Sequence, residues 1–263
     1  MAFLELHCYS EALLHQVAMN VLLPQQHPWQ KPLEGPRRTL YLLHGLGDDH
    51  TGWQRLTSLE RYVEEQNIAV IMPSTMRGFW TDMADGGPRY WTFVSEELPA
   101  LMESLLGIRP NRETTFAAGL SMGGYGALKL GFRCPERFRA VAALSAAPIS
   151  RRMAKAQLKE TDNEVIATMI RRVFGGELSP ENDIFQLAEA CREPRPDVYM
   201  AVGADDYLCP LNRELYRHIE RQGYRVIWRE TPGQAHTWKF WDLCLPKVIE
   251  WIMGFERTGA RQA

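Results

Sequence analysis

The feature that most restricts the fold of this chain is the alternation of short apolar runs with longer segments of helical length. Six runs have the length and the β-branched or aromatic content typical of strands: Thr39–Leu43, Ile68–Pro73, Thr114–Gly119, Arg139–Leu144, Val198–Gly203 and Arg225–Trp228. Five segments are long enough for helices: Trp53–Gln66, Ser95–Leu106, Gly123–Cys134, Asn212–Gln222 and Phe240–Met253. Strands and helices that alternate along a chain form βαβ units. The sequence therefore predicts an α/β fold with a mainly parallel central sheet and helices on both faces.

The N-terminal segment departs from this alternation. Two apolar runs, Phe3–Tyr9 and His15–Leu22, follow one another in the chain, and the turn-like Ser10–Glu11 lies between them. Such a pair predicts an antiparallel hairpin, which we expect at one edge of the sheet.

A second departure lies at residues 150–196. This stretch is highly charged, and it contains a predicted helix at Asn163–Phe174 and a helix start at Ser179–Pro180. We expect a small helical cap inserted over the sheet and not a second domain. The chain is thus predicted to form a single domain over residues 1–255, followed by a frayed tail at 256–263 that has no apolar periodicity.

The charge balance and the apolar pattern exclude two classes of partner. The chain has 30 Lys and Arg against 32 Asp and Glu, a net charge of -2. We expect no nucleic-acid ligand, because this balance provides no positive field for a phosphate backbone. No apolar run approaches the ~18 residues of a membrane helix. The first residues lack the basic-then-apolar order of a secretory signal, so we expect a cytoplasmic protein without membrane contact.

The cysteines indicate neither a disulfide framework nor a metal site. They are scattered along the chain at positions 8, 134, 191, 209 and 244, and none belongs to a Cys-x-x-Cys pair. Free cysteine behaves mainly as a small apolar residue. We therefore expect ordinary buried or half-buried thiols and no bound metal.

The most informative motif is Gly119-Leu120-Ser121-Met122-Gly123, which follows one predicted strand and precedes one predicted helix. A G-x-S-x-G sequence in this context forms a sharp turn that exposes the serine hydroxyl, and its glycines let the strand and the helix approach closely. A serine hydroxyl becomes a nucleophile when a base accepts its proton. Ser121 is therefore the predicted nucleophile.

The base is expected to be a histidine that follows Ser121, because serine, acid and histidine occur in this order in enzymes with this turn. Two histidines follow it. His218 lies within a predicted helix, where a solvated or half-buried position is expected. His236 lies in a loop between a predicted strand and the last predicted helix, at the carboxyl edge of the sheet. We predict that His236 is the base.

The acid is expected between the nucleophile and the base, on a loop that follows a strand. Asp205 and Asp206 come shortly after the apolar run Val198–Gly203, and no other carboxylate in the interval is as well placed. Strand periodicity does not show which of these two side chains turns inward. On the residues alone, both stay candidates.

A serine that attacks a carbonyl carbon also needs two backbone N–H donors for the oxyanion. One donor comes from the residue after the nucleophile, which is Met122. The other comes from a loop after an earlier strand, and the glycine-rich His44-Gly45-Leu46-Gly47 fits this position. Leu46 is the predicted donor, and His44 is expected to brace the loop by hydrogen bonding.

Four separated blocks carry a resemblance to a known family: HGLGDDHTGW, GLSMGGYGALKLGF, GADDYL and GQAHTWKFWD, together with DIFQLAE in the insertion. From about residue 3 to residue 254 the chain resembles the esterase D family of α/β-hydrolases, and within it the tributyrin esterases. The resemblance implies an α/β-hydrolase fold and a serine carboxylesterase that hydrolyses short-chain acyl esters without metal or cofactor. One departure is the acidic pair in HGLGDD, where family members commonly have glycine and asparagine.

Carried over by position, the resemblance implies that Ser121 is the nucleophile, Asp206 the acid and His236 the base. It also implies that Leu46 and Met122 line the oxyanion hole. In the related esterases the acid lies three residues after a glycine, and this spacing selects Asp206 over its neighbour.

The aromatic residues near these blocks are Trp80, Tyr90, Trp91, Trp238 and Trp241. We expect most of them in the core, and we expect Trp238, two residues after the base, to form a wall of the acyl or alcohol pocket. The expected partner is a small-molecule ester. The resemblance keeps two alternatives open, an S-formylglutathione hydrolase and an acyltransferase that uses the same acyl-enzyme. Family habit and the exposed edge of the sheet lead us to expect a homodimer or homotetramer.

Overall fold

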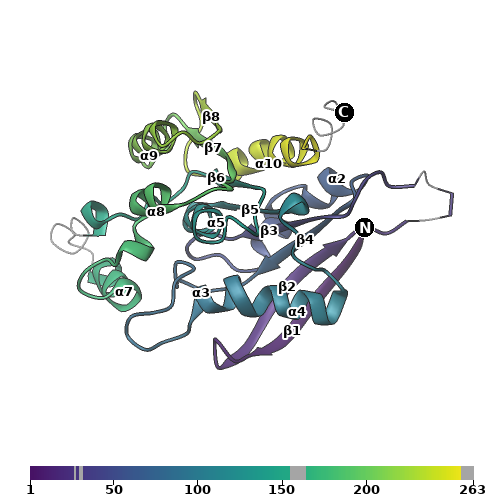
Figure 1. The fold of residues 1–263 in the computed structure, drawn as a ribbon, viewed down its shortest axis with the longest axis horizontal. Coiled ribbons are helices and arrows are strands. Elements are labelled where there is room, and N and C mark those ends of the chain that lie inside the picture. The colour runs from purple at the N-terminus through teal and green to yellow at the C-terminus, as the bar shows by residue number, and fades with distance from the viewer. Residues whose placement is uncertain (27, 30–31, 155–163, 256–263) are drawn as a thin grey trace.

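The computed structural model describes residues 1–26, 28–29, 32–154 and 164–255. Within these residues, eight strands form one sheet in the order β1-β2-β4-β3-β5-β6-β7-β8 (Figure 1). The strands are β1 (Ala2–Ser10), β2 (His15–Leu23), β3 (Arg38–Leu43), β4 (Ile68–Pro73), β5 (Thr115–Leu120), β6 (Ala140–Leu144), β7 (Asp197–Gly203) and β8 (Val226–Thr231).

The pairing of these strands confirms the predicted α/β-hydrolase fold. β3 pairs in parallel with β4 and β5, and parallel pairing continues through β6 and β7 to β8. β1 and β2 form the predicted antiparallel hairpin, and β2 pairs antiparallel with β4. β8 extends beyond its predicted end at Trp228, because its residues pair with those of β7 as far as the pair Gly203–Thr231. The carboxyl ends of the parallel strands share one edge of the sheet, where functional loops gather in open α/β folds.

Helices cover both faces of the sheet (Figure 1). They are α1 (Gly52–Leu56), α2 (Leu59–Val63), α3 (Tyr90–Thr92), the π-helix η1 (Phe93–Glu97), α4 (Leu98–Leu106), η2 (Arg112–Thr114), α5 (Met122–Arg133), α7 (Glu164–Phe174), η3 (Pro180–Asn182), α8 (Ile184–Ala190), α9 (Cys209–Arg221) and α10 (Trp238–Met253). One buried apolar cluster includes Trp53 of α1 and Leu245 of α10. A second, larger cluster includes Met102 of α4, Leu128 of α5 and Leu187 of α8. The sheet separates the two clusters, and successive apolar side chains of β3, Leu42 and Leu43, belong to different ones.

The prediction of one helix over Trp53–Gln66 is wrong, because the structure has two short helices, α1 and α2, in its place. Between them the backbone of Thr57 is extended, with φ -135° and ψ 173°. The Thr57 hydroxyl donates to the carbonyl oxygen of Trp53 at 2.5 Å, and Asp242 of α10 accepts the Ser58 N–H at 2.9 Å. Side chains that bond nearby backbone groups compete with helical hydrogen bonds. The helix therefore breaks at this point.

Three other helices begin two or more residues earlier than the sequence predicts. The predicted helix Ser95–Leu106 is continuous with α3 and η1, so the helical chain begins at Tyr90. α9 begins at Cys209, and Pro210 lies in its first turn, where the missing N–H would have no helical partner. α10 begins at Trp238. The apolar pattern locates these helices, whereas their first turns depend on capping and packing.

The described part of the predicted insertion contains α7, η3 and α8. The backbone amides of Ala84 and Asp85 donate to the carbonyl oxygens of Val173 and Arg172 at 3.1 and 3.2 Å, so the end of α7 is attached to the loop after β4. Residues 155–163 of the insertion and the predicted tail at 256–263 lie outside the described residues. Among the described helices, none has the length and apolar content that crossing a membrane requires.

Candidate active site

Ser121 lies between β5 and α5, on a turn with a strained backbone. Its φ of 52° and ψ of -115° lie outside the regions that non-glycine residues favour. The Ser121 amide donates to the carbonyl oxygen of Leu144 on β6 at 2.8 Å. The neighbouring strand thus holds the serine in this conformation, as a sharp strand-to-helix turn requires.

The two outer glycines of the motif are needed because backbone atoms approach them closely. A Cβ atom at Gly119 would lie 2.3 Å from the carbonyl oxygen of Gly123, and one at Gly123 would lie 2.2 Å from that of Leu43. Such distances are far inside van der Waals contact. A larger residue at either position would push α5 away from β3 and β5 and would displace Ser121.

His236 lies within hydrogen-bond distance of both Ser121 and Asp206. Its Nε2 is 3.1 Å from Oγ of Ser121, and its Nδ1 is 2.9 Å from Oδ2 of Asp206. The Asp206 side chain is fully buried, and the His236 side chain is 18% exposed. A neutral imidazole that donates from Nδ1 leaves Nε2 free to accept the serine proton. The structure therefore brings together the three residues that the sequence places in three separate loops.

The two adjacent carboxylates have different surroundings. Asp205 is exposed, whereas Asp206 is buried and faces His236. Oδ1 of Asp206 also accepts the Leu208 N–H at 2.8 Å. Burial alone would raise the pKa of Asp206, but hydrogen bonds from His236, Ser145 and Leu208 outweigh it and hold the pKa below its ordinary value. Asp206 is therefore ionised and can stabilise a positive charge on the imidazole.

His44 braces the loop that carries Leu46. The Thr75 amide donates to its Nε2 at 3.0 Å, and its Nδ1 lies 2.7 Å from the carbonyl oxygen of Gly45. Because Nε2 accepts a hydrogen bond, the proton of the neutral ring is on Nδ1. Burial lowers the pKa of His44 to about 4, so the ring is neutral at physiological pH. Backbone groups thus engage both ring nitrogens, as expected for a bracing residue.

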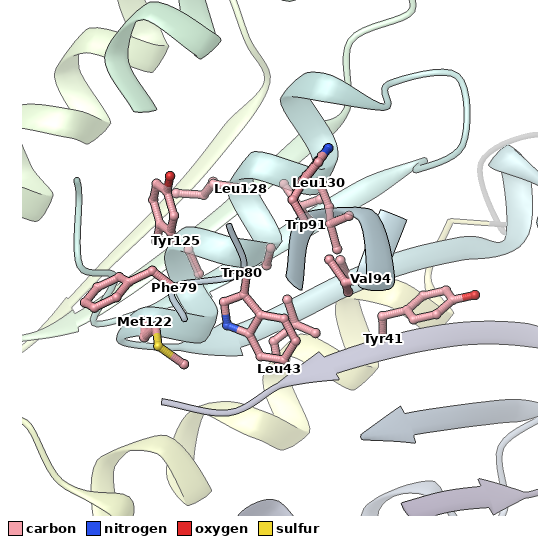
Figure 2. Close-up of a cluster of buried hydrophobic side chains, with 14 of the residues drawn as sticks. Tyr41, Leu43, Phe79, Trp80, Trp91, Val94, Met122, Tyr125, Leu128 and Leu130 are labelled. Carbon is pink, nitrogen blue, oxygen red and sulfur yellow. The ribbon is translucent and has the colours of Figure 1, made fainter. Parts of the chain in front are cut away.

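Leu46 and Met122 lie on the two segments that the sequence selects for the oxyanion donors. Leu46 is in the turn after β3, and the close approach of α5 to the end of β3 brings the two segments together. Met122 is the first residue of α5, where backbone N–H groups have no partner within the helix. Its side chain is buried in the apolar cluster with Phe79 and Trp80 (Figure 2). This packing fixes the amino-terminal end of α5 beside Ser121.

Trp238 connects the loop before α10 with the loop after β3. Its ring packs edge to face on Trp53, with 5.2 Å between the ring centroids, and both Trp238 and Asp48 lie against Gly52. Burial raises the pKa of Asp48. The other member of the acidic pair, Asp49, accepts the N–H and the hydroxyl of Thr51 at 2.8 and 2.5 Å, at the start of α1. Asp48 and Asp49, the acidic pair that departs from the family pattern, therefore both contact neighbouring residues of the protein.

The sequence does not assign a role at the site to Trp241, whose ring packs against His236 with 4.9 Å between centroids, or to Ser145. Trp241 is buried, as expected for a core aromatic residue, but its Nε1 donates to Oγ of Ser145 at 3.2 Å. The only local signal is that Ser145 follows β6 as Ser121 follows β5. The other aromatic residues near the motifs, Trp80, Tyr90 and Trp91, belong to the large apolar cluster.

His218, the other candidate base, lies away from this site. It is on α9, its Nε2 lies 3.1 Å from the carbonyl oxygen of Phe185, and the two rings pack at 5.1 Å. Within the described residues, no group of three or more His, Cys, Asp or Glu side chains is arranged to hold a metal ion.

Comparison with known proteins identifies the family. The sequence profile of the Esterase family, described as "Putative esterase", matches residues 10–247. An acetyl esterase of Caldicellulosiruptor saccharolyticus is 31% identical over 262 residues, which cover 96% of this chain and 98% of the relative. The solved structure of fluorophosphonate-binding serine hydrolase F of Staphylococcus aureus is 27% identical, with a TM-score of 0.82 over 95% of this chain and 98% of that chain.

A second solved structure, an S-formylglutathione hydrolase of Staphylococcus aureus, is 26% identical, with a TM-score of 0.80 over 95% of this chain and 98% of that chain. The family profile and the acetyl esterase both extend over most of this chain, so the similarity is not confined to one motif. These matches confirm the resemblance to an esterase family of α/β-hydrolases that the sequence motifs indicate. The chain therefore belongs to the Esterase family and is a serine carboxylesterase with the α/β-hydrolase fold.

Proposed function

We propose that this chain hydrolyses esters of short acyl chains through an acyl-enzyme on Ser121. The observation that carries the proposal is the continuous hydrogen-bonded line from Oγ of Ser121 through His236 to the buried carboxylate of Asp206. Such a line activates a serine hydroxyl and stabilises the imidazolium that forms.

In the first half of the reaction, Oγ of Ser121 attacks the carbonyl carbon of the ester and its proton moves to Nε2 of His236. The carbonyl oxygen becomes an oxyanion, and the backbone N–H groups of Leu46 and Met122 are the proposed donors to it. Collapse of the tetrahedral intermediate breaks the bond to the alcohol oxygen, which takes the proton from His236. The alcohol leaves and the acyl group stays on Ser121.

In the second half, a water molecule replaces the alcohol. His236 accepts a proton from the water as its oxygen attacks the acyl carbon, and the same two N–H groups hold the second oxyanion. Collapse returns the proton to Oγ of Ser121 and releases the carboxylic acid. Asp206 stays ionised throughout and keeps Nδ1 of His236 protonated.

The short acyl chain is proposed because of the groups that flank Ser121. Trp238, between the Leu46 loop and the His236 loop, is the proposed wall of the acyl or alcohol pocket. Residues 150–196 are the proposed cap of the single domain. The acetyl esterase among the relatives, which is similar over nearly its whole length, supports a small acyl group. Tributyrin, as in the tributyrin esterases, is the proposed glyceride substrate.

The nucleophile is tested with a fluorophosphonate probe, because a relative of this fold is named for binding such compounds. Incubation followed by peptide mass spectrometry is expected to find the phosphonate on Ser121 alone. Modification of another residue, or no modification, would contradict the proposed acyl-enzyme.

A second candidate function is S-formylglutathione hydrolysis, which the solved structure of that name favours. The same acyl-enzyme would then form from a thioester. The two candidates are separated by measuring kcat/KM for p-nitrophenyl acetate, tributyrin, methyl ferulate and S-formylglutathione under one condition. We expect the acetyl and butyryl esters to give the higher values, and a dominant value for S-formylglutathione would select the second candidate.

Acyl transfer is the remaining alternative, since an alcohol can replace water in the second half-reaction. It is tested by adding an alcohol acceptor to an ester assay and separating the products. We expect free acid as the main product, whereas a new ester as the main product would favour an acyltransferase.

A homodimer or homotetramer is the proposed assembly. Strands β1 and β8 are the two edges of the sheet in the described residues, and each has one side without a pairing strand. Natural proteins protect such edges, and association between copies is one way to do so. Light scattering of the purified protein is expected to give two or four times the mass of one chain, and a monomer would contradict this proposal.

A further inference from the structure

The tyrosine that follows the proposed acid is held at the surface of the protein. Tyr207 is 72% exposed, whereas its neighbours in the chain, Asp206 and Leu208, are buried. Backbone hydrogen bonds fix the turn that carries it. The Asp206 amide donates to the carbonyl oxygen of Gly203 at 3.2 Å, and the Cys209 amide donates to that of Asp206 at 2.8 Å. The outward position of the Tyr207 side chain is therefore set by the turn.

An exposed apolar side chain is not by itself evidence of a site, because such side chains occur singly on most protein surfaces. Tyr207 differs because its ring packs against the imidazole of the proposed base. The centroids of the Tyr207 and His236 rings are 4.8 Å apart, and the interplanar angle is 52°. An exposed aromatic surface thus adjoins the group that moves the proton.

The other groups that contact the imidazole are buried. Nε2 of His236 is engaged by Ser121 and Nδ1 by Asp206, and Trp241 packs against the ring at 4.9 Å. All three of these residues are buried. A substrate group that approaches His236 from solvent therefore meets the Tyr207 ring.

The alcohol part of the ester has to lie beside the same imidazole. In the proposed acylation step, the alcohol oxygen takes its proton from Nε2 of His236 as its bond to the carbonyl carbon breaks. Such a transfer requires hydrogen-bond distance between the two heavy atoms, about 2.6–3.2 Å. The group attached to this oxygen therefore begins next to the His236 ring, within reach of Tyr207.

The acyl chain and the oxyanion point away from this side. The tetrahedral carbon on Oγ of Ser121 carries the oxyanion toward Leu46, the alcohol oxygen toward His236, and the acyl chain in the remaining direction. In the sheet, β3 and β7 lie on opposite sides of β5. The Leu46 loop follows β3 and Tyr207 follows β7, so the two residues lie on opposite sides of Ser121.

We propose that Tyr207 is a specificity residue for the alcohol part of the ester, and that it favours aromatic alcohols over alkyl alcohols of the same acyl group. The inference rests on the proposed function. Aromatic rings pack on one another in offset or edge-to-face arrangements, and a tyrosine ring offers an apolar face while its hydroxyl stays in water. A phenyl group on the leaving oxygen is large enough to pack on this face, whereas a methyl group is not.

The test uses four esters that combine two acyl groups with two alcohols: methyl acetate, phenyl acetate, methyl butyrate and phenyl butyrate. For each ester, kcat/KM of Tyr207→Ala is divided by kcat/KM of the unmodified protein. Each ratio refers to one ester, so the intrinsic reactivity of the leaving group cancels. The constant kcat/KM compares the free enzyme and ester with the transition state, and it therefore includes the departure of the alcohol.

The ratio is expected to depend on the alcohol and not on the acyl group. Tyr207→Ala should lower kcat/KM for both phenyl esters by about tenfold, because it removes an aromatic contact and the apolar area that this contact buries. Both methyl esters should change by less than about twofold. Tyr207→Phe keeps the ring and should retain the phenyl values within about twofold, whereas Tyr207→Leu should give an intermediate loss.

A matched control is available on the hairpin. Tyr9 is 50% exposed and belongs to β1, the edge strand of the sheet beyond β2 and β4. Tyr9→Ala should leave all four ratios near one. Circular dichroism checks that each variant is folded, which is expected because both tyrosines are exposed.

The pattern of the four ratios decides the outcome. Ratios that follow the acyl group would place Tyr207 on the acyl side and overturn the proposal. Equal ratios below one would show that the side chain only supports His236, and ratios of one would show that it does not contact the substrate; each overturns the proposal as well. If the unmodified protein hydrolyses none of the four esters, the proposed function fails. If it hydrolyses them without the expected dependence on the alcohol, only this inference fails.

Discussion

Oδ2 of Asp206 lies 2.9 Å from Nδ1 of His236, although thirty residues separate the two in the chain. The contact is possible because β7 and β8 are parallel neighbours, so the loop after each strand emerges at the same edge of the sheet. Gly203, the last residue of β7, permits the close packing of these loops, since a Cβ there would lie 2.1 Å from the carbonyl oxygen of Gln234. The geometry of the site thus depends on the register of two strands.

Replacement of Asp206 by asparagine is expected to lower kcat by about 10⁴, because an amide can present a donor where Nδ1–H of His236 needs an acceptor. Asp205→Asn is the matched control, and it should keep at least about a tenth of the activity, because the Asp205 side chain is exposed to solvent. Steady-state kinetics on p-nitrophenyl acetate measure both. The reverse order of activities would move the acid to Asp205.

Replacement of Ser121 by alanine is expected to lower kcat by ~10³–10⁶ and to leave the fold intact, since only the nucleophilic oxygen is removed. Circular dichroism and the thermal unfolding midpoint check the fold, and ester hydrolysis checks the rate. The variant should also no longer react with the fluorophosphonate. Retention of activity would show that another residue carries the acyl group.

Gly123→Ala is expected to lower the free energy of unfolding by about 3 kcal/mol or more, together with the activity, because its Cβ would meet the carbonyl oxygen of Leu43 at 2.2 Å. Gly176→Ala is the control, since a Cβ at Gly176 meets no atom within 4 Å. That change should stay within about 0.5 kcal/mol. Urea unfolding measures both, and equal stabilities would refute the close approach of α5 to β3.

The stability of the protein is expected to depend on pH through His44. Its pKa is lowered to about 4 in the folded protein, against the ordinary 6.5, so the unfolded chain binds this proton first as the pH falls. The contribution of His44 is therefore complete above pH ~6.5 and decreases toward pH ~4. Between pH 8 and pH 5 it should fall by about 2 kcal/mol.

Urea unfolding of His44→Gln and of the unmodified protein at several pH values isolates this contribution, because the other groups are common to both. The variant should show a pH dependence that is smaller by this amount. His15→Gln, a change at an exposed histidine, should leave the dependence as it is. Parallel curves for His44→Gln and the unmodified protein would contradict the neutral, buried state of His44.

Acyl chain length is expected to limit the rate. A longer chain gains ~0.8 kcal/mol for each methylene only if the pocket has room for it, and otherwise it clashes. If Trp238 forms a wall of the pocket, kcat/KM should fall for acyl chains longer than about six carbons. A series of p-nitrophenyl esters from acetate to dodecanoate measures this, and a value that rises through the whole series would contradict a closed pocket.

Much of the fold follows from features that are local in the sequence. Apolar runs of strand length, the spacing of turn residues and the order of the segments predict a parallel sheet with an N-terminal hairpin, and the structure has both. The turn at Ser121 is also locally encoded, because glycines on both sides of a serine between a strand and a helix allow few other conformations. Where prediction was wrong, as in the helix over Trp53–Gln66, the break involves Asp242, which is 184 residues beyond Ser58 in the chain.

The sequence by itself determined the sharp turn at Ser121, the two loops that could hold an acid and a base, and the family to which the chain is similar. The family spacing favoured Asp206, but only the tertiary structure turned that carboxylate inward and left Asp205 in solvent. The bond between Trp241 and Ser145, which are 96 residues apart, likewise has no counterpart in any local pattern. The physical reason is that periodicity and turn chemistry act between near neighbours in the chain, whereas side-chain orientation at the site depends on strand register and on packing between distant segments.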